Sequence, residues 1–176
     1  MAGRAPRRRI TARGQRFAVL AARFNEAISK RLLDGALSAF AAHGVPADAV
    51  ETHWVPGSFE LPQAALALAR TGRFDGIVCV GVVIKGETPH FEYVSSAAAH
   101  GITDAALATG VPVSFGVVTA LTEEQALDRA GGAVANRGQE AALAALEMAG
   151  WLREVHGRPR TRRGGAASRA SGPGRR

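Results

Sequence analysis

Four short segments carry the residue types best suited to chemistry in this sequence, and each follows a predicted strand. They are 23–26 (Arg-Phe-Asn-Glu), 56–60 (Pro-Gly-Ser-Phe-Glu), 85–90 (Lys-Gly-Glu-Thr-Pro-His) and the stretch around Thr119. Parallel sheets bind ligands beyond the carboxyl ends of their strands. We therefore expect an aromatic ring, a carboxylate, a glycine turn and a histidine to face one crevice, where they could bind a small molecule and move a proton.

The segment 85–90 is the most informative of the four. Thr88 is a favourable N-cap and Pro89 suits a first helical position, so we expect a helix to begin here after a turn at Gly86. The free N–H groups and the dipole of such a helix suit a phosphate group. His90 would lie in the first turn, either as an acid–base residue or as an ordinary solvated histidine. Neither Gly-Lys-Ser/Thr nor Gly-x-Gly-x-x-Gly is present, which excludes the two common nucleotide-binding loops.

Other candidate residues have two interpretations each. Glu60, at a predicted helix start, could complement the helix dipole or hold sugar hydroxyls. Phe24 and Phe115 could belong to the core or stack on a flat ring. Arg129 could be a solvated charge or a guanidinium that binds phosphate.

The elements that must position these residues alternate between strand and helix. Short apolar runs predict strands at 17–22, 50–55, 76–84 and 113–119, and the run 76–84, apolar on both faces, is typical of a central strand. Helical periodicity covers the segments between and after them: 26–44, 61–70, 91–108, 122–130 and 136–155. This alternation predicts an α/β fold, a three-layer α/β/α sandwich with a four-stranded parallel sheet, flavodoxin-like in style.

The net charge of +7 is unevenly distributed along the 176 residues. Residues 1–16 contain six arginines and residues 157–176 contain seven, without any acidic residue in either tail. The remaining nine basic residues face all 15 acidic residues in 17–156, which gives this segment a net charge of −6. We therefore expect one acidic domain over 17–156 between two disordered basic tails, 1–16 and 157–176.

Composition excludes several classes of protein. The single Cys79 rules out a disulfide framework and a cysteine-cluster metal site. The longest apolar run is far shorter than the ~20 residues of a membrane helix, and no apolar signal-peptide core follows the N-terminus. We expect a cytoplasmic protein without a membrane partner. The basic tails suggest a polyanion-binding protein as an alternative, but they lack the interleaved aromatics of a specific nucleic-acid binder.

Six segments, in order, resemble one enzyme family. They are RFNEAISKRLLDGAL (23–37), VPGSFELP (55–62), GVVIKGETPHFEYVS (81–95), PVSFGVVT (112–119), EQALDRAG (124–131) and NRGQEAA (136–142). Together they are similar to 6,7-dimethyl-8-ribityllumazine synthases, which catalyse the penultimate step of riboflavin biosynthesis. The resemblance runs from about Phe17 to Val155 and leaves both tails out.

The resemblance implies a flavodoxin-like sandwich and a condensation between two small-molecule substrates. In that reaction 5-amino-6-(D-ribitylamino)uracil and 3,4-dihydroxy-2-butanone 4-phosphate give the lumazine, phosphate and water, and the resemblance implies that no metal and no cofactor take part. The family's uracil contacts correspond to Phe24 on the pyrimidine ring, with the ribityl chain on 58–60 (Ser58, Phe59 and Glu60) and the pyrimidine edge on the backbone of 82–84 (Val82, Val83 and Ile84). The phosphate contacts correspond to Glu87 and Thr88.

The resemblance also implies a catalytic residue and a partner. His90 matches the family's proton-transfer residue. Phe115 and Arg129 match residues supplied by the neighbouring subunit, with Phe115 on the uracil substrate and Arg129 on the phosphate. Family members are homopentamers, and some assemble into icosahedral 60-subunit shells. Arg137 stands where members often have a substrate-contacting lysine. A non-catalytic paralogue that binds flavin or lumazine is the alternative that keeps the same fold.

Overall fold

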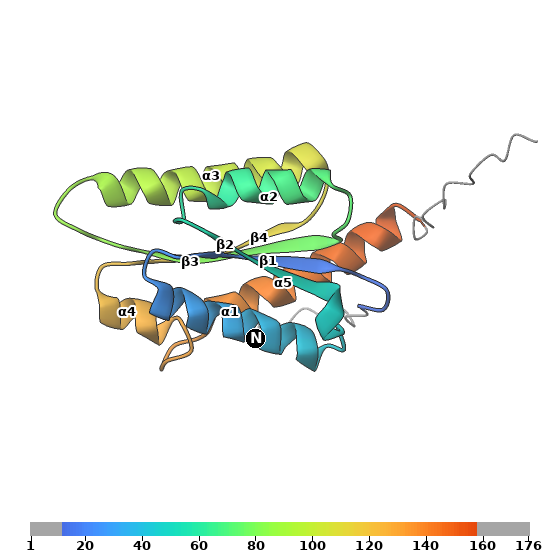
Figure 1. The fold of residues 1–176 in the computed structure, drawn as a ribbon, viewed down its shortest axis with the longest axis horizontal. Helices are drawn as coiled ribbons and strands as arrows, with labels where there is room; N and C mark the ends of the chain where they lie inside the picture. Colours follow the sequence, from blue (N-terminus) through green and yellow to red (C-terminus); the bar gives the residue numbers. More distant parts are fainter. Residues whose placement is uncertain (1–11, 158–176) are drawn as a thin grey trace, which may run out of the picture.

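The computed structural model describes residues 12–157, which form the α/β architecture expected from the sequence (Figure 1). The strands are β1 (Phe17–Ala22), β2 (Val50–Val55), β3 (Gly76–Ile84) and β4 (Val113–Ala120). The helices are α1 (Glu26–Ala42), α2 (Leu61–Arg70), α3 (His90–Thr109), α4 (Glu123–Asp128) and α5 (Arg137–Val155), with a short 3-10 helix at Ala47–Ala49. Residues 1–11 and 158–176, most of the two predicted tails, lie outside the described residues.

The four strands form one parallel sheet in the order β2-β1-β3-β4. Helices α1, α4 and α5 cover one face and helices α2 and α3 cover the other, so the predicted three-layer sandwich is confirmed (Figure 1). Successive side chains of a strand point to opposite faces. Along β1, Phe17, Val19 and Ala21 accordingly pack under α1 and α5, and the alternate residues pack under α2 and α3. The central strands β1 and β3 are therefore apolar on both sides.

The predicted element boundaries agree closely with the observed ones, with small differences at helix ends. The first three strands begin and end at the predicted residues, and β4 continues one residue further, to Ala120. One local prediction was wrong: Thr88 is not the N-cap of α3. The helix begins at His90, Pro89 occupies the cap position, and no side chain caps it. The Pro89 carbonyl accepts the first hydrogen bonds of the helix, from the N–H groups of Glu92 at 3.0 Å and Tyr93 at 3.4 Å, so the helix begins one residue later than a cap at Thr88 would place it.

The amino edge of the sheet, where the strands begin, is held by a group of paired charges. The Glu51 carboxylate accepts hydrogen bonds from Arg16 and Arg73, each at 3.1 Å. The backbone N–H of Arg16 donates to Asp75 at 2.8 Å. These contacts connect the residue before β1, the second residue of β2 and the loop before β3. Partial desolvation would raise the pKa of Glu51, but the Arg16 hydrogen bond and the charges of Arg73 and Arg16 outweigh it and lower that pKa.

No helix among residues 12–157 is long and apolar enough to cross a membrane.

Candidate active site

The turn after β1 holds Phe24 out into solvent. The backbone N–H groups of Arg23 and Phe24 donate to the carbonyls of Val55 and Pro56, at 2.8 and 3.0 Å, which ties the ends of β1 and β2 together. Asn25 then adopts a left-handed conformation with φ of 57°, a region in which asparagine is one of the more tolerated residues. The Phe24 side chain is 71% exposed, so the structure rules out the core interpretation of this residue.

Three neighbouring side chains in the turn after β2 differ in their exposure to solvent. The N–H of Glu60 donates to the Gly57 carbonyl at 3.2 Å, which leaves Phe59 exposed and Glu60 half-buried at the start of α2. Ser58 points inward instead, with only 5% of its surface exposed. A Cβ at Gly81 of β3 would lie 2.7 Å from the Ser58 hydroxyl oxygen, so the glycine gives this loop room to pack on β3.

The last residues of β3 have one free backbone edge. β3 pairs with β4 as far as Ile84, but its described pairing with β1 stops at Val80. Val82 and Val83 are buried by their side chains, yet no described strand pairs with them on the β1 side. The backbone N–H and C=O groups of these residues can therefore form hydrogen bonds with the polar edge of a planar ligand, because backbone donors and acceptors need partners.

The loop after β3 leaves its polar side chains exposed. Glu87, Thr88 and His90 are all exposed, and within residues 12–157 their side chains make no hydrogen bond or ion pair with the protein. The loop itself is anchored at both ends: the Lys85 N–H donates to Ala120 at 2.9 Å, and the Lys85 ammonium lies 3.3 Å from Glu92. A backbone hydrogen bond at Glu92 and the Lys85 ammonium hold the pKa of the Glu92 carboxyl below its usual range.

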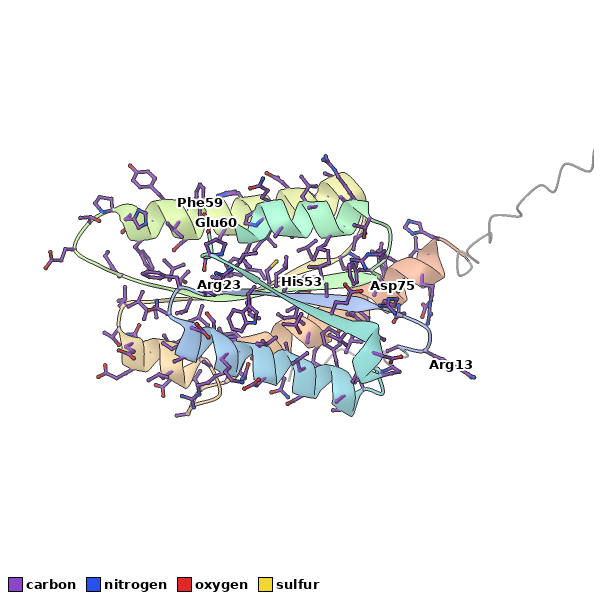
Figure 2. All side chains as sticks on the ribbon, in the orientation of Figure 1. Arg13, Arg23, His53, Phe59, Glu60 and Asp75 are labelled. Carbon is purple, nitrogen blue, oxygen red and sulfur yellow. The ribbon has the colours of Figure 1, made fainter. Side chains whose placement is uncertain are left out.

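The strand order brings these three segments to one edge of the sheet. β2, β1 and β3 are neighbours, so the segments that follow them share the carboxyl edge. In Figure 2, Arg23, Phe59 and Glu60 lie towards one end of the sheet, and Asp75 and Arg13 lie towards the other. Ten of the twelve candidate residues belong to this group: Phe24, Ser58, Phe59, Glu60, Val82, Val83, Ile84, Glu87, Thr88 and His90.

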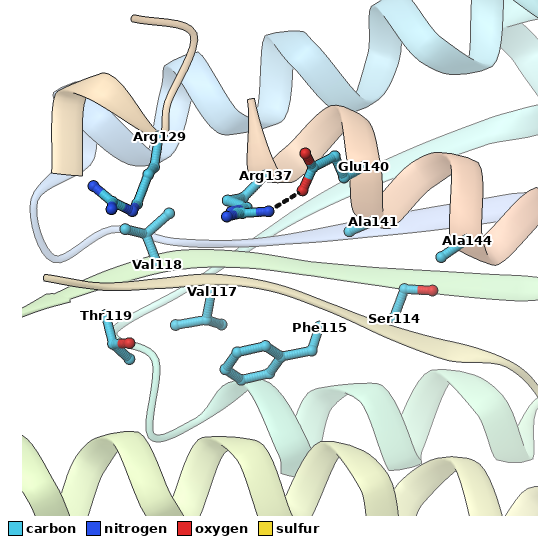
Figure 3. A pocket seen from close by; sticks show the side chains of 10 residues that line it. All are labelled: Ser114, Phe115, Val117, Val118, Thr119, Arg129, Arg137, Glu140, Ala141 and Ala144. Carbon is cyan, nitrogen blue, oxygen red and sulfur yellow. Dashed lines mark hydrogen bonds and ion pairs between the residues drawn. The ribbon is translucent and has the colours of Figure 1, made fainter. Parts of the chain in front are cut away.

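The other two candidates, Phe115 and Arg129, line a separate pocket of about 490 Å³ beside the outer strand β4 (Figure 3). The pocket wraps around the free edge of this strand, with Phe115 on one side and the arginines on the other. The remaining lining residues come from β4 and the first turns of α5: Ser114, Val117, Val118, Thr119, Arg137, Glu140, Ala141 and Ala144. Phe115 is 43% exposed, so it too is not a core residue.

Two guanidinium groups give the pocket its chemical character. The Arg129 guanidinium donates to the Gln125 carbonyl at 2.9 Å, and the Arg137 guanidinium pairs with the Glu140 carboxylate. A pair of guanidiniums near an exposed aromatic ring suits an anionic ligand with a flat ring. Sequence reasoning did not place Glu140 here, although its position three residues after Arg137 on a helix is a signal for such a pair.

Metal chemistry has no candidate site in this part of the chain. Among residues 12–157, no three His, Cys, Asp or Glu side chains are grouped so that they could hold a metal ion. Cys79 is buried in β3, and burial raises the pKa of its thiol, so it is not a reactive thiolate.

The comparison with known proteins covers all of these segments. The sequence pattern of the 6,7-dimethyl-8-ribityllumazine synthase family matches residues 14–153. The chain belongs to this family. A protein of Syntrophus aciditrophicus (strain SB), named 6,7-dimethyl-8-ribityllumazine synthase, is 48% identical over 147 residues, which cover 84% of this chain and 96% of that protein. The family match includes both the carboxyl edge and the β4 pocket, and it ends before residues 158–176.

Proposed function

We propose that this protein is a transferase-class enzyme of riboflavin biosynthesis. It condenses 5-amino-6-(D-ribitylamino)uracil with 3,4-dihydroxy-2-butanone 4-phosphate and releases 6,7-dimethyl-8-ribityllumazine, phosphate and water. The observation that carries this proposal is the family match over 14–153, which includes all twelve candidate residues.

The uracil substrate fits the part of the carboxyl edge formed by β1, β2 and β3. Phe24 offers an exposed ring for stacking on the pyrimidine, and Glu60 offers to the ribityl hydroxyls a carboxylate that pairs with no group among residues 12–157. The backbone of 82–84 offers the unpaired edge described above to the polar edge of the pyrimidine. Ser58 and Phe59 complete the ribityl-binding segment.

The phosphate substrate fits the loop before α3. Glu87 and Thr88 lie just before the capping residue Pro89, and the first N–H groups of a 20-residue helix lack intrahelical partners. The acidic domain, with a net charge of −6 over 17–156, would repel a phosphate at long range. Local groups must therefore bind it, and Arg129 is the cation that we assign to it.

The chemistry asks little of the protein beyond positioning and proton transfer. The amine of the uracil attacks the ketone of the butanone, so no nucleophilic side chain is required. That attack gives an imine with loss of one water. Loss of phosphate then gives an enol that tautomerises to a ketone, and attack of the second nitrogen on this ketone with loss of a second water closes the ring. Holding the two substrates together can supply about 7–11 kcal/mol at best, and His90 as general acid–base adds about 10²–10⁴-fold.

A complete site in this proposal requires a second copy of the chain. β4 is separated from β1 by β3, so Phe115 and Arg129 lie across the sheet from Phe24 in the same chain. Phe24 and Phe59 are largely exposed, as expected for a surface that a partner covers. We propose a homopentamer in which each site receives Phe115 and Arg129 from its neighbour. Light scattering tests the pentamer and the 60-subunit shell at once, and a monomer would contradict both. The cytoplasmic location remains a prediction.

The decisive experiment uses the full chain and the two substrates. Purified protein is mixed with both, and the fluorescence of the lumazine is followed against the spontaneous reaction. A rate above the spontaneous one is expected. Lumazine binding without acceleration would contradict the enzyme and would favour a non-catalytic binding paralogue.

A further inference from the structure

The start of α5 lies unusually close to α1. A Cβ at Gly138 would stand 2.6 Å from the Leu32 carbonyl carbon, so no larger residue fits there without moving one of the helices. Gly35 plays the same part on α1, because a Cβ at this position would collide with the Asn136 side chain. Gly138 thus lets the two helices approach, and Gly35 leaves the space in which the Asn136 amide lies.

The Asn136 amide uses both of its polar ends. Its Oδ1 accepts a hydrogen bond from the Gln139 N–H at 3.1 Å, which caps α5. Its Nδ2 donates to the Arg31 carbonyl at 3.1 Å, which attaches the same residue to α1. A cap needs only the first bond, and serine supplies it as well as asparagine does. The second bond is specific to an amide and fixes where α5 begins relative to α1.

The position of Asn136 also determines the position of the two arginines in the β4 pocket. Ala130 and Asn136 form an antiparallel bridge, and the Arg137 N–H donates to the Arg129 carbonyl at 2.9 Å. The segment 129–137 is therefore a short strap, closed across its base, with Arg129 at one end and Arg137 at the other. Both guanidiniums line the pocket, while Asn136 itself does not.

We propose that Asn136 is a positioning residue for the anionic substrate: it fixes the strap on α1 and thereby sets where the Arg129 and Arg137 guanidiniums stand. This inference rests on the proposed function for its substrate. Asn136 acts through the arginines and has no contact with the reacting atoms. Its second bond, to Arg31, sets the register of the strap, and the first bond only stabilises the helix.

The variant Asn136→Ser separates the two bonds without a change of charge. Serine keeps the cap and loses the donor to Arg31. We expect the KM for the butanone phosphate and the Kd for inorganic phosphate to rise by about 10- to 100-fold, the scale of an ångström-sized misplacement. The KM for the uracil substrate and kcat are expected to change by less than about twofold, because the uracil contacts and His90 lie at the carboxyl edge and, for Phe115, on β4, outside the strap.

A second variant perturbs the Asn136 amide from helix α1. Gly35→Ala leaves the asparagine in place but displaces its side chain, so it should raise the same KM and the same Kd. The double variant Gly35→Ala/Asn136→Ser should be no worse than Asn136→Ser alone, because the smaller serine leaves room for the new methyl group. Effects that multiply would show two independent sites and would overturn the shared role.

Val45→Ala is the matched control for lost stability. Val45 is a buried residue in the loop after α1, away from the strap and the pocket. It should lower Tm and leave both phosphate constants unchanged. If Asn136→Ser lowers Tm but leaves the phosphate KM and Kd unchanged, Asn136 is only a helix cap and the inference is wrong.

The two proposals fail in distinguishable ways. If the wild-type chain makes no lumazine, the proposed function falls, and the inference is then judged on the Kd of inorganic phosphate alone. A wild-type chain that does not bind phosphate, or an Asn136→Ser variant that binds it as well as wild type, overturns the inference.

Discussion

Titratable side chains at the two edges of the same sheet differ in whether they pair with other side chains. At the amino edge, Glu51 is bound by two arginines, and His53 lies 3.5 Å from its second oxygen. At the carboxyl edge, within residues 12–157, Glu60 and His90 make no hydrogen bond or ion pair through their side chains. Neither side chain of the second group therefore supports the fold through a polar contact among the described residues. This contrast supports the proposal that the unpaired carboxyl edge binds a ligand, whereas the paired amino edge stabilises the fold.

The largest expected effect comes from removing the histidine at the unpaired edge. His90→Ala should lower kcat by about 10²–10⁴-fold, the range of general acid–base catalysis, and leave Tm unchanged because the side chain is exposed. Stopped-flow or fluorescence assays with saturating substrates measure it. The matched control is His53→Ala at the paired edge, which should leave kcat unchanged. Equal losses in the two variants would remove the functional difference between the edges.

A carboxylate at each edge gives the next comparison. Glu60→Gln should raise the KM for the uracil substrate by about tenfold or more, because a hydrogen bond to a charged group contributes about 1.5–3 kcal/mol. Steady-state kinetics with the uracil varied at saturating butanone phosphate measures this. Glu51→Gln should leave that KM unchanged. A Glu60 variant with wild-type kinetics would mean that the ribityl chain lies elsewhere.

We expect the paired charges of the amino edge to stabilise the fold in a way that depends on pH. The pKa of Glu51 is lower in the folded chain than its usual value of 4.5, so its ionised form stabilises the fold. That contribution is complete well above pH 4.5 and is lost as the pH falls through the lowered folded pKa. Glu51→Gln should therefore have a lower Tm than wild type at pH 7, with the two values converging in acid. Thermal unfolding between pH 7 and pH 3 measures the difference, and a constant gap would contradict the assignment.

The sequence predicted local features well because their causes are local. The apolar run 76–84 and the helix-stopping glycines fix strand and helix positions within a residue or two, and the segments after three strands share one edge as expected. Contacts between residues far apart in the sequence could not be predicted, because no local sequence pattern marks them. Asn136 and Gly35 are 101 positions apart, and only the packing of α5 on α1 shows why one must be glycine. The cap of α3 was misplaced because Thr88 is a favourable cap by residue type, whereas the backbone of the loop places Pro89 there.

One ion pair at the carboxyl edge departs from the contrast, and it should have the smallest effect. Lys85 and Glu92 are both about half exposed and lie 3.3 Å apart, so water screens their attraction. Lys85→Met should change kcat/KM by less than about threefold, since exposed pairs contribute little. It should also let the pKa of Glu92 rise towards 4.5, because the ammonium is one of the causes that lower it. Carboxyl chemical shifts followed by NMR titration measure that rise. A large loss of activity in Lys85→Met would show that this pair holds Glu87 and Thr88 in place for phosphate, and the carboxyl edge would then depend on a charge pair as the amino edge does.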